Sequence, residues 1–308
     1  MKLVLLSNSF LVEIQKLDCT TYRFKMSSTS TENTFSLYKI SSHEPLDGLK
    51  RSKCKKCGKS RMFFCYICHS YVDTIDTSKL PTVKLPWKVD IIKHAKEVDG
   101  KSTAIHAALL APDDVKIYTY PTIPDYSKIS KVLLVFPGKN ACTLEEIFRK
   151  SNKRHGCEGD VKDTCASKKA KTETPEVAIS IKDETVSKEN GEHKADSKSN
   201  IETSQLQSFT KIVFIDCTWS QAYSIFRDER VSHLKTVKLG DLQTVYWRHN
   251  QDMPFTYLAT IEAIFSFFKI THELLNGSYE GQYDNLLYFF SYFYKMVRKS
   301  NSKKISMI

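Results

Sequence analysis

Long apolar runs and acidic side chains are both in short supply in this sequence of 308 residues. No run approaches the roughly 20 consecutive apolar residues that span a bilayer, which excludes an integral membrane protein. Lys and Arg number 46 against 35 Asp and Glu, so the formal net charge is +11. That surplus makes a polyanion the expected partner, nucleic acid before a membrane surface. Met1–Leu6 is apolar, but no small-residue cleavage site follows it, so we do not expect a secretory signal.

Large apolar side chains are missing from one internal segment. From Ser151 to Gln205 there is no Phe, Trp, Tyr, Leu or Met, while Lys, Glu, Asp and Ser dominate. Such a segment cannot bury enough apolar area to offset the entropy of ordering it. We therefore predict a disordered charged insertion over 151–205, and a disordered amino-terminal extension over the polar residues 1–47.

The remaining chain is predicted to form a small cysteine module at 48–72 and one catalytic domain made of 73–150 and 206–300. Within the insertion, Lys153-Arg154 and Lys168-Lys169 are compatible with a nuclear import signal and equally with a solvated charge run. We expect the protein in the nucleus, with the cytoplasm as an additional location.

The apolar pattern of the two blocks predicts an α/β fold. Continuous apolar runs suit strands that are buried on both faces of a parallel sheet covered by helices. The runs 132–136 and 212–215 are of this kind, and 116–120 and 236–239 are further short β-rich runs. Two capping boxes, Thr143–Glu146 and Thr218–Gln221, predict helix starts directly after a strand. Apolar residues at helical spacing predict two long helices, over 261–275 and 286–297.

Four cysteines lie within 15 residues in the pattern C-x2-C-x7-C-x2-C, namely Cys54, Cys57, Cys65 and Cys68. Two C-x2-C pairs can complete the tetrahedron that structural zinc requires, so we predict a zinc site. Seven of the twelve residues from Lys50 to Arg61 are Lys or Arg, which lowers the cost of holding thiolates. The same cations could bind RNA phosphates, and we name Lys53, Lys55, Lys56 and Arg61 as candidates. The alternative is a zinc staple whose exposed lysines have no partner.

The most informative turn follows the apolar run 212–215. Asp216 ends this expected strand, and the Thr218 capping box begins a helix at once. The carboxyl ends of parallel strands face the crevice in which α/β folds bind ligands, and the first turn of a helix can bind a carboxylate. Asp216 is therefore a candidate base or cation partner, and Trp219 offers a flat face for a base or adenine. The alternative is equally open: a helix-start carboxylate and a core aromatic.

Several blocks in a fixed order resemble the DTW-domain family of tRNA-uridine aminocarboxypropyltransferases, and most closely its eukaryotic type-1 members. The family is named for an Asp-x-Thr-Trp motif, which stands here at Asp216–Trp219. The other blocks are the cysteine cluster, 101–107, 118–121, 135–138, 246–249, 259–263 and 281–286. Ala259 departs from the Ser that many relatives carry there. The resemblance covers 50–298 apart from the insertion.

This resemblance implies a fold, a reaction and its partners. Members transfer the 3-amino-3-carboxypropyl group of S-adenosyl-L-methionine (SAM) to N3 of a tRNA uridine, which gives acp3U and 5′-methylthioadenosine. Type-1 members imply a D-loop uridine, at position 20, in a loop whose bases can be read individually. A SPOUT-like, knotted parallel sheet is implied by the similar rRNA enzymes. SAM as co-substrate, structural zinc and tRNA are the expected partners, and the oligomeric state is left open.

The resemblance also implies roles for single residues. Asp216 is expected either to take the N3 proton or to hold the ribose or amino group of SAM. Thr218 is expected to cap its helix, and Trp219 to wall SAM or uracil. Residues expected to shape the SAM pocket are Pro137, Gly138, Thr260 and Glu262, and expected contacts to RNA or a carboxylate are Arg248 and His249. Two other functions compete: a SPOUT-type RNA methyltransferase, and a non-catalytic zinc-dependent RNA-binding protein.

Overall fold

The computed structural model of this chain describes residues 34–148, 209–246, 254 and 256–305. The expected insertion 151–205 and most of the expected extension, residues 1–33, lie outside these residues. The chain divides into a unit up to Leu37 and a unit from Tyr38 onward, and everything below concerns the second. No helix among the described residues is both long enough and apolar enough to cross a bilayer.

A six-stranded, all-parallel sheet forms the centre of this unit, so the expected mixed α/β fold is confirmed. The strand order is β6-β5-β9-β7-β10-β8. In chain order the strands are β5 (Lys88–His94), β6 (Val115–Tyr120), β7 (Val132–Val135), β8 (Cys142–Thr143), β9 (Lys211–Asp216) and β10 (Lys235–Lys238). The four predicted strands correspond to β6, β7, β9 and β10, and the two that were not predicted are β5 and β8.

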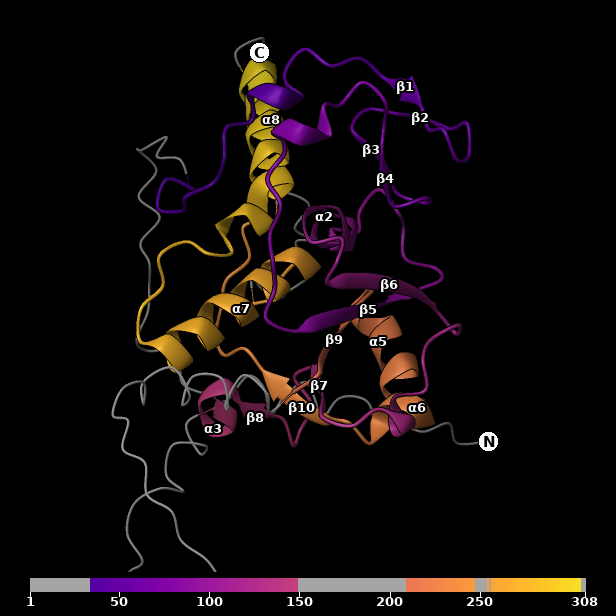
Figure 1. Cartoon of the computed structure of the whole chain (residues 1–308), viewed down its shortest axis with the longest axis vertical. Coiled ribbons are helices and arrows are strands. Elements are labelled where there is room, and N and C mark those ends of the chain that lie inside the picture. Colours follow the sequence, from indigo (N-terminus) through magenta and orange to yellow (C-terminus); the bar gives the residue numbers. More distant parts are fainter. Residues whose placement is uncertain (1–33, 149–208, 247–253, 255, 306–308) are drawn as a thin grey trace, which may run out of the picture. The chain divides into compact units, whose positions relative to one another are not determined.

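Helices cover both faces of the sheet, as Figure 1 shows. α7 (Thr260–Asn276) lies on one face, and α5 (Trp219–Phe226) and α6 (Glu229–Ser232) lie on the other. Alternation along β9 explains how one strand serves both layers. Phe214 packs edge-on against Phe267 of α7 at 5.9 Å between ring centroids, whereas Val213 packs in the cluster that contains Ile225 of α5.

Shorter elements complete the sheet unit. α3 (Leu144–Phe148) follows the predicted capping box, in which Glu146 Oε2 accepts from the Thr143 amide at 2.8 Å. The described residues also form α2 (Ala104–Leu110) and α8 (Tyr288–Ile305). The 3-10 turns among them are η1 (Glu44–Leu46), η2 (Thr77–Lys79), η3 (Tyr126–Lys128) and η5 (Asp284–Leu287). The predicted start of the last helix at Leu286 falls in η5, two residues before α8 begins at Tyr288.

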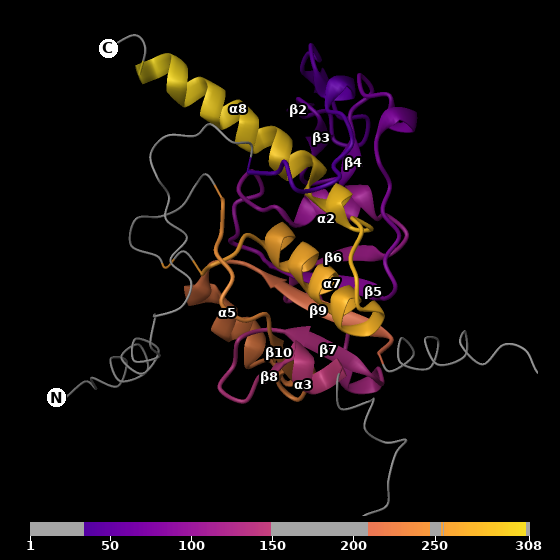
Figure 2. The ribbon, with the colours of Figure 1, turned by 90° about the vertical axis from the view of Figure 1, so that its left-hand side faces the viewer.

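The cysteine module consists of two short antiparallel hairpins. β1 (Ser52–Lys53) pairs with β2 (Ser60–Arg61), and β3 (Phe64–Cys65) pairs with β4 (Ser70–Tyr71). The second hairpin and the residue before it share one hydrophobic cluster with α2 and α8, in which Phe63 and Phe64 meet Leu109 and Phe289. Figure 2 shows the hairpins beside α2 and the first turns of α8. The module is therefore packed onto the rest of the unit.

Residues 38–47 differ from the expected disordered extension. The amide of Lys39 donates to Asp284 Oδ2 at 2.6 Å, and the amide of Ser41 donates to Asn285 Oδ1 at 2.8 Å. Leu46 is 1% exposed in the cluster beneath the cysteine module. These contacts join residues about 245 positions apart. The polar composition of this segment therefore could not predict that it is ordered.

Candidate active site and metal centre

Asp216 lies at the carboxyl end of the central strand β9 and is 3% exposed. Its two oxygens accept hydrogen bonds from different elements. Ser102 Oγ, just before α2, donates to Oδ2 at 2.7 Å, and Thr260 Oγ1, the first residue of α7, donates to Oδ1 at 2.5 Å. The carboxylate therefore joins the amino-terminal ends of two helices to the end of the sheet at which the parallel strands terminate.

Burial raises the pKa of Asp216, and this effect outweighs the two hydroxyl donors and the positive charge of Lys93, which lower it. Lys93 is the register partner of Asp216 on β5 and forms an ion pair with Asp99. Glu97 is close enough to interact with the site, since burial first and the Asp216 charge second raise its pKa. A carboxyl group with a raised pKa is a stronger proton acceptor than an ordinary aspartate.

Glu262, expected at the SAM pocket, is buried and already has three donors. The Thr244 hydroxyl and the Ala259 amide donate to Oε2 at 2.6 and 2.7 Å, and the Val245 amide donates to Oε1 at 2.8 Å. Burial raises its pKa, and these hydrogen bonds lower it. Glu262 thus fixes residues 244–245 to the start of α7. Its bond to the Ala259 amide also caps the helix at the position where the side chain of Ala259 offers no hydroxyl.

Thr218 begins α5 as predicted: its amide donates to Gln221 Oε1 at 3.3 Å. Trp219 is half-buried and packs on Tyr257 at 4.5 Å and on Phe136 at 6.1 Å between ring centroids. It belongs to the cluster on the α5 face of the sheet, whereas Asp216 bonds the starts of α2 and α7. The two motif residues therefore lie on opposite faces of the end of β9.

Pro137 and Gly138 follow β7, which pairs directly with β9, so they lie at the same edge of the sheet as Asp216. Pro137 is exposed. A Cβ added to Gly138 would meet its nearest atom, in Phe226, at 3.7 Å, which is ordinary contact. The fold itself therefore does not require a glycine at this position.

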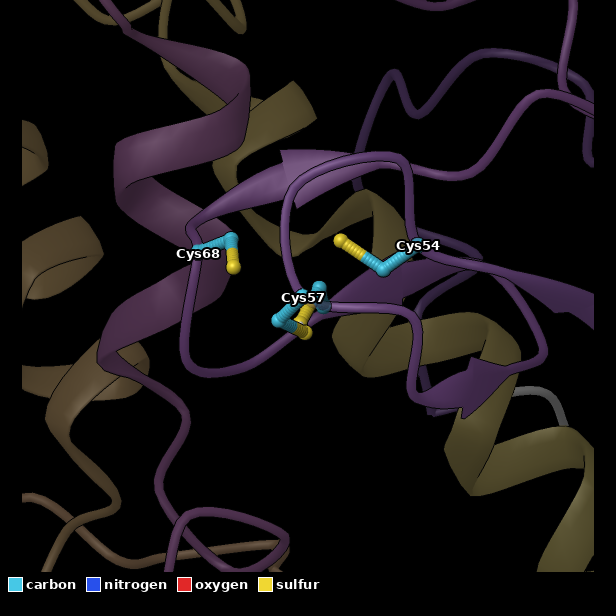
Figure 3. Close-up of side chains that lie close together, drawn as sticks. Cys54, Cys57 and Cys68 are labelled. Carbon is cyan, nitrogen blue, oxygen red and sulfur yellow. The ribbon is translucent and has the colours of Figure 1, made fainter.

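The four predicted zinc ligands come together in the cysteine module. Their sulfur atoms all lie within 4.8 Å of one another, and those of Cys54, Cys57 and Cys68 point toward one another in Figure 3. The sulfur atoms of Cys57 and Cys65 are 3.5 Å apart. Burial would raise the pKa of Cys65, but hydrogen bonds from the amides of Cys68 and Ile67 lower it to about 6. Desolvation and the neighbouring thiols raise the pKa of Cys68 to about 12.

The predicted RNA contacts fall into two groups. Lys53, Lys55 and Lys56 are exposed on the module, and the guanidinium of Arg61 lies 5.1 Å from the centroid of the Tyr66 ring. Arg248 and His249 lie outside the described residues.

Comparison with known proteins decides the family. The DTW domain matches residues 62–298 of this chain. The chain belongs to the DTW-domain family. The matched range includes Cys65 and Cys68 but begins after Cys54 and Cys57, so the module spans the border of the DTW domain.

Three similar DTW-family relatives are each named tRNA-uridine aminocarboxypropyltransferase 1. The mouse protein is 42% identical over 255 residues, which cover 81% of this chain and 78% of the relative. The Xenopus tropicalis protein is 38% identical and covers 89% of this chain and 90% of the relative. The human protein is 40% identical and covers 81% and 78%. No solved structure matches this chain.

Two residues at this DTW-domain site were not predicted. Ser102 reaches Asp216 from 114 positions away, and Thr244 reaches Glu262 from 18 positions away. Ser102 belongs to the motif block 101–107, but the resemblance did not predict its hydrogen bond to Asp216. Thr244 precedes the block at 246–249, and nothing in its local sequence marks it.

Proposed function

We propose that this chain is a SAM-dependent tRNA-uridine aminocarboxypropyltransferase that acts on N3 of a D-loop uridine. The observation that carries the proposal is the similarity of about 40% over most of the chain to relatives with that named activity, together with the DTW domain. A net charge of +11 suits a polyanionic substrate.

The reaction sets a clear task for the protein side chains. N3 of the uridine loses its proton and forms a bond to the γ-carbon of the methionyl arm of SAM. The bond from that carbon to sulfur breaks, and its electron pair stays on sulfur, which leaves 5′-methylthioadenosine. The protein must accept one proton and present the γ-carbon rather than the methyl group, so positioning and proton transfer carry the catalysis.

Asp216 is the group that we assign to the N3 proton. Its pKa is raised by burial, which favours proton uptake, and each carboxylate oxygen keeps a second acceptor site beyond its hydroxyl donor. Ser102 and Thr260 orient the carboxylate. Trp219, at the start of α5, and Gly138, after β7, follow the carboxyl ends of two paired strands and are assigned to SAM. Glu262 is a positioning residue: it holds the start of α7, whose first residue, Thr260, bonds Asp216.

The cysteine module is assigned a structural zinc ion. Four thiolates at about 2.3 Å from zinc stand about 3.8 Å apart, and the four sulfurs here, at 3.5 Å for the Cys57–Cys65 pair and within 4.8 Å for all, need only small shifts to reach that spacing. Zinc would hold the two hairpins together through Cys54, Cys57, Cys65 and Cys68. Less than half an equivalent of zinc in gently purified protein would contradict this assignment.

We also propose a SPOUT-like, knotted fold and a nuclear location. The all-parallel sheet is compatible with the SPOUT-like, knotted fold that the related rRNA enzymes imply. An experimental chain trace through 149–208 would test the knot. Nuclear location rests on basic residues in 151–205 and is tested by imaging the full chain and a variant that lacks that segment.

The decisive experiment incubates the full chain with SAM and unmodified tRNA. We expect acp3U in the nucleoside mass spectrum and an equal amount of 5′-methylthioadenosine. S-adenosylhomocysteine in its place would indicate a methyltransferase. Binding of tRNA without consumption of SAM would indicate a non-catalytic RNA-binding protein. Transcribed tRNA with the D-loop uridine changed to cytidine is the matched substrate control.

A further inference from the structure

The last helix carries positive charge that the active site does not use. α8 (Tyr288–Ile305) contains no Asp or Glu, and Lys295, Arg298 and Lys299 are all exposed on it. The helix dipole favours cations only within the last turn. Lys295 and Arg298 lie before that turn, so the dipole does not account for them. An exposed cationic stretch of this kind is suited to a polyanion.

The first turns of α8, which lead into its basic part, pack against the cysteine module. The ring of Phe63 lies 5.5 Å from Tyr292 and 5.7 Å from Phe293, and the ring of Phe64 lies 5.1 Å from Phe289. Figure 2 shows the first turns of α8 beside the hairpins and its second half extending away from them. Because one aromatic cluster fixes both elements, the cations of the module and those of α8 are carried by a single support.

Both elements place an arginine over a tyrosine ring. Arg61 lies 5.1 Å from the Tyr66 centroid in the module, and Arg298 lies 5.0 Å from the Tyr294 centroid on α8. A guanidinium held over a ring keeps its planar donors in a defined orientation, which suits phosphates and unstacked RNA bases. The acidic Asp73 beside the module is engaged by Lys55 at 2.9 Å.

We propose that the second half of α8 and the cysteine module form one binding surface for the tRNA backbone, which we call the α8–module surface. It comprises Lys53, Lys55, Lys56, Arg61, Lys295, Arg298 and Lys299. The inference rests on the proposed function, because tRNA is the polyanion it names. The surface is connected to the active site through α2, which packs on the module and is preceded by Ser102, the donor to Asp216.

The test reverses the charges of α8 in the full-length protein. The variant Lys295→Glu/Arg298→Glu/Lys299→Glu is compared with Lys116→Glu/Lys128→Glu/Lys235→Glu, which changes the net charge equally at exposed positions of the sheet unit. The affinity for tRNA is measured between 50 and 200 mM salt. Each lost phosphate contact removes about 0.7 to 0.9 from the slope of log affinity against log salt. The α8 variant should therefore lose a slope of about two to three, and the control should lose less than one.

Two further measurements keep the outcome readable. SAM affinity and thermal stability should match wild type in the α8 variant. If the charge reversal unfolds the helix, the milder Lys295→Gln/Arg298→Gln/Lys299→Gln replaces it and should also lower the salt slope of tRNA binding. Equal slopes for the α8 variant and its control would overturn the α8–module surface. If wild type binds tRNA through α8 but releases no 5′-methylthioadenosine, the transferase function fails and the surface stands.

Discussion

Replacing Asp216 by asparagine should separate catalysis from folding. The side chain is 3% exposed, and burial raises its pKa even after its two hydroxyl donors are counted. At neutral pH the ionised carboxylate therefore costs stability, by about 1.4 kcal/mol for each unit by which its native pKa exceeds the usual value. Asparagine removes this cost. Its hydrogen bonds survive, because the hydroxyls of Ser102 and Thr260 can accept as well as donate.

The sign of the pH dependence follows from the raised pKa. The contribution of Asp216 to stability is complete below its unfolded pKa and is lost as the pH rises through its folded pKa. Asp216→Asn should therefore melt at or above the wild-type temperature at pH 7, and the difference should shrink toward acid pH. A missing general base lowers kcat by about 10²- to 10⁴-fold. The assays are thermal melts from pH 4 to 8 and the release of 5′-methylthioadenosine.

Glu262→Gln is the matched control. Burial raises the pKa of both carboxyl groups, but only Glu262 accepts from backbone amides, which cannot reverse their direction, so this substitution should lower stability. Each Glu262 oxygen accepts from a different backbone amide, those of Val245 and Ala259. Glutamine has one oxygen, so one of the two N–H groups must face an NH2 group, at a cost of about 1–3 kcal/mol. A melting temperature for Asp216→Asn that falls as far as that of Glu262→Gln would refute the raised pKa of Asp216, and release of 5′-methylthioadenosine near the wild-type rate would refute its assignment to the N3 proton.

Three further predictions follow from single residues. His106 is 4% exposed, its Nδ1 has no hydrogen-bond partner, and burial lowers its pKa to about 3. The free energy of unfolding should therefore fall by about 2 kcal/mol between pH 6.5 and 5. In denaturant melts of His106→Leu, this fall between the two pH values should be smaller by that amount. Gly138→Ala should melt like wild type, because its Cβ has room, yet weaken SAM binding measured by calorimetry; unchanged affinity would place SAM elsewhere. Cys65→Ser should lose zinc by metal analysis and expose the cluster under the module to proteolysis, whereas Cys142→Ser should do neither.

The sequence predicted most directly the strands that are continuous apolar runs. β7 and β9 are continuous apolar runs, and the runs themselves indicate burial on both faces. β5 escaped prediction because Asp90 and Lys93 interrupt its apolar pattern. Both charges are neutralised only by the fold: Asp90 Oδ2 accepts from Lys211 at 2.7 Å, and Lys93 pairs with Asp99. A pattern read along the chain cannot include partners that the chain brings in from elsewhere.

The same limit applies to the site. The order of motif blocks and the cysteine spacing predicted the family and the thiol cluster, which depend on residues close together in the sequence. The hydroxyls that orient Asp216 come from the starts of two helices, so the sequence could name the carboxylate but not its donors. Trp219 and Asp216 are three positions apart, yet the turn after β9 sends them to opposite faces of the sheet.

α2 connects the two functional regions of this unit. At its start, Ser102 bonds Asp216, and Thr103 Oγ1 accepts from the amide of Ile261 in α7 at 3.1 Å. Its apolar face packs into the cluster beneath the cysteine module and α8. A helix of seven residues is too short to be stable alone, so both contacts are needed to hold it. The cysteine module therefore helps to position the donor of Asp216, and loosening the hairpins should disturb the active site even where no RNA is bound.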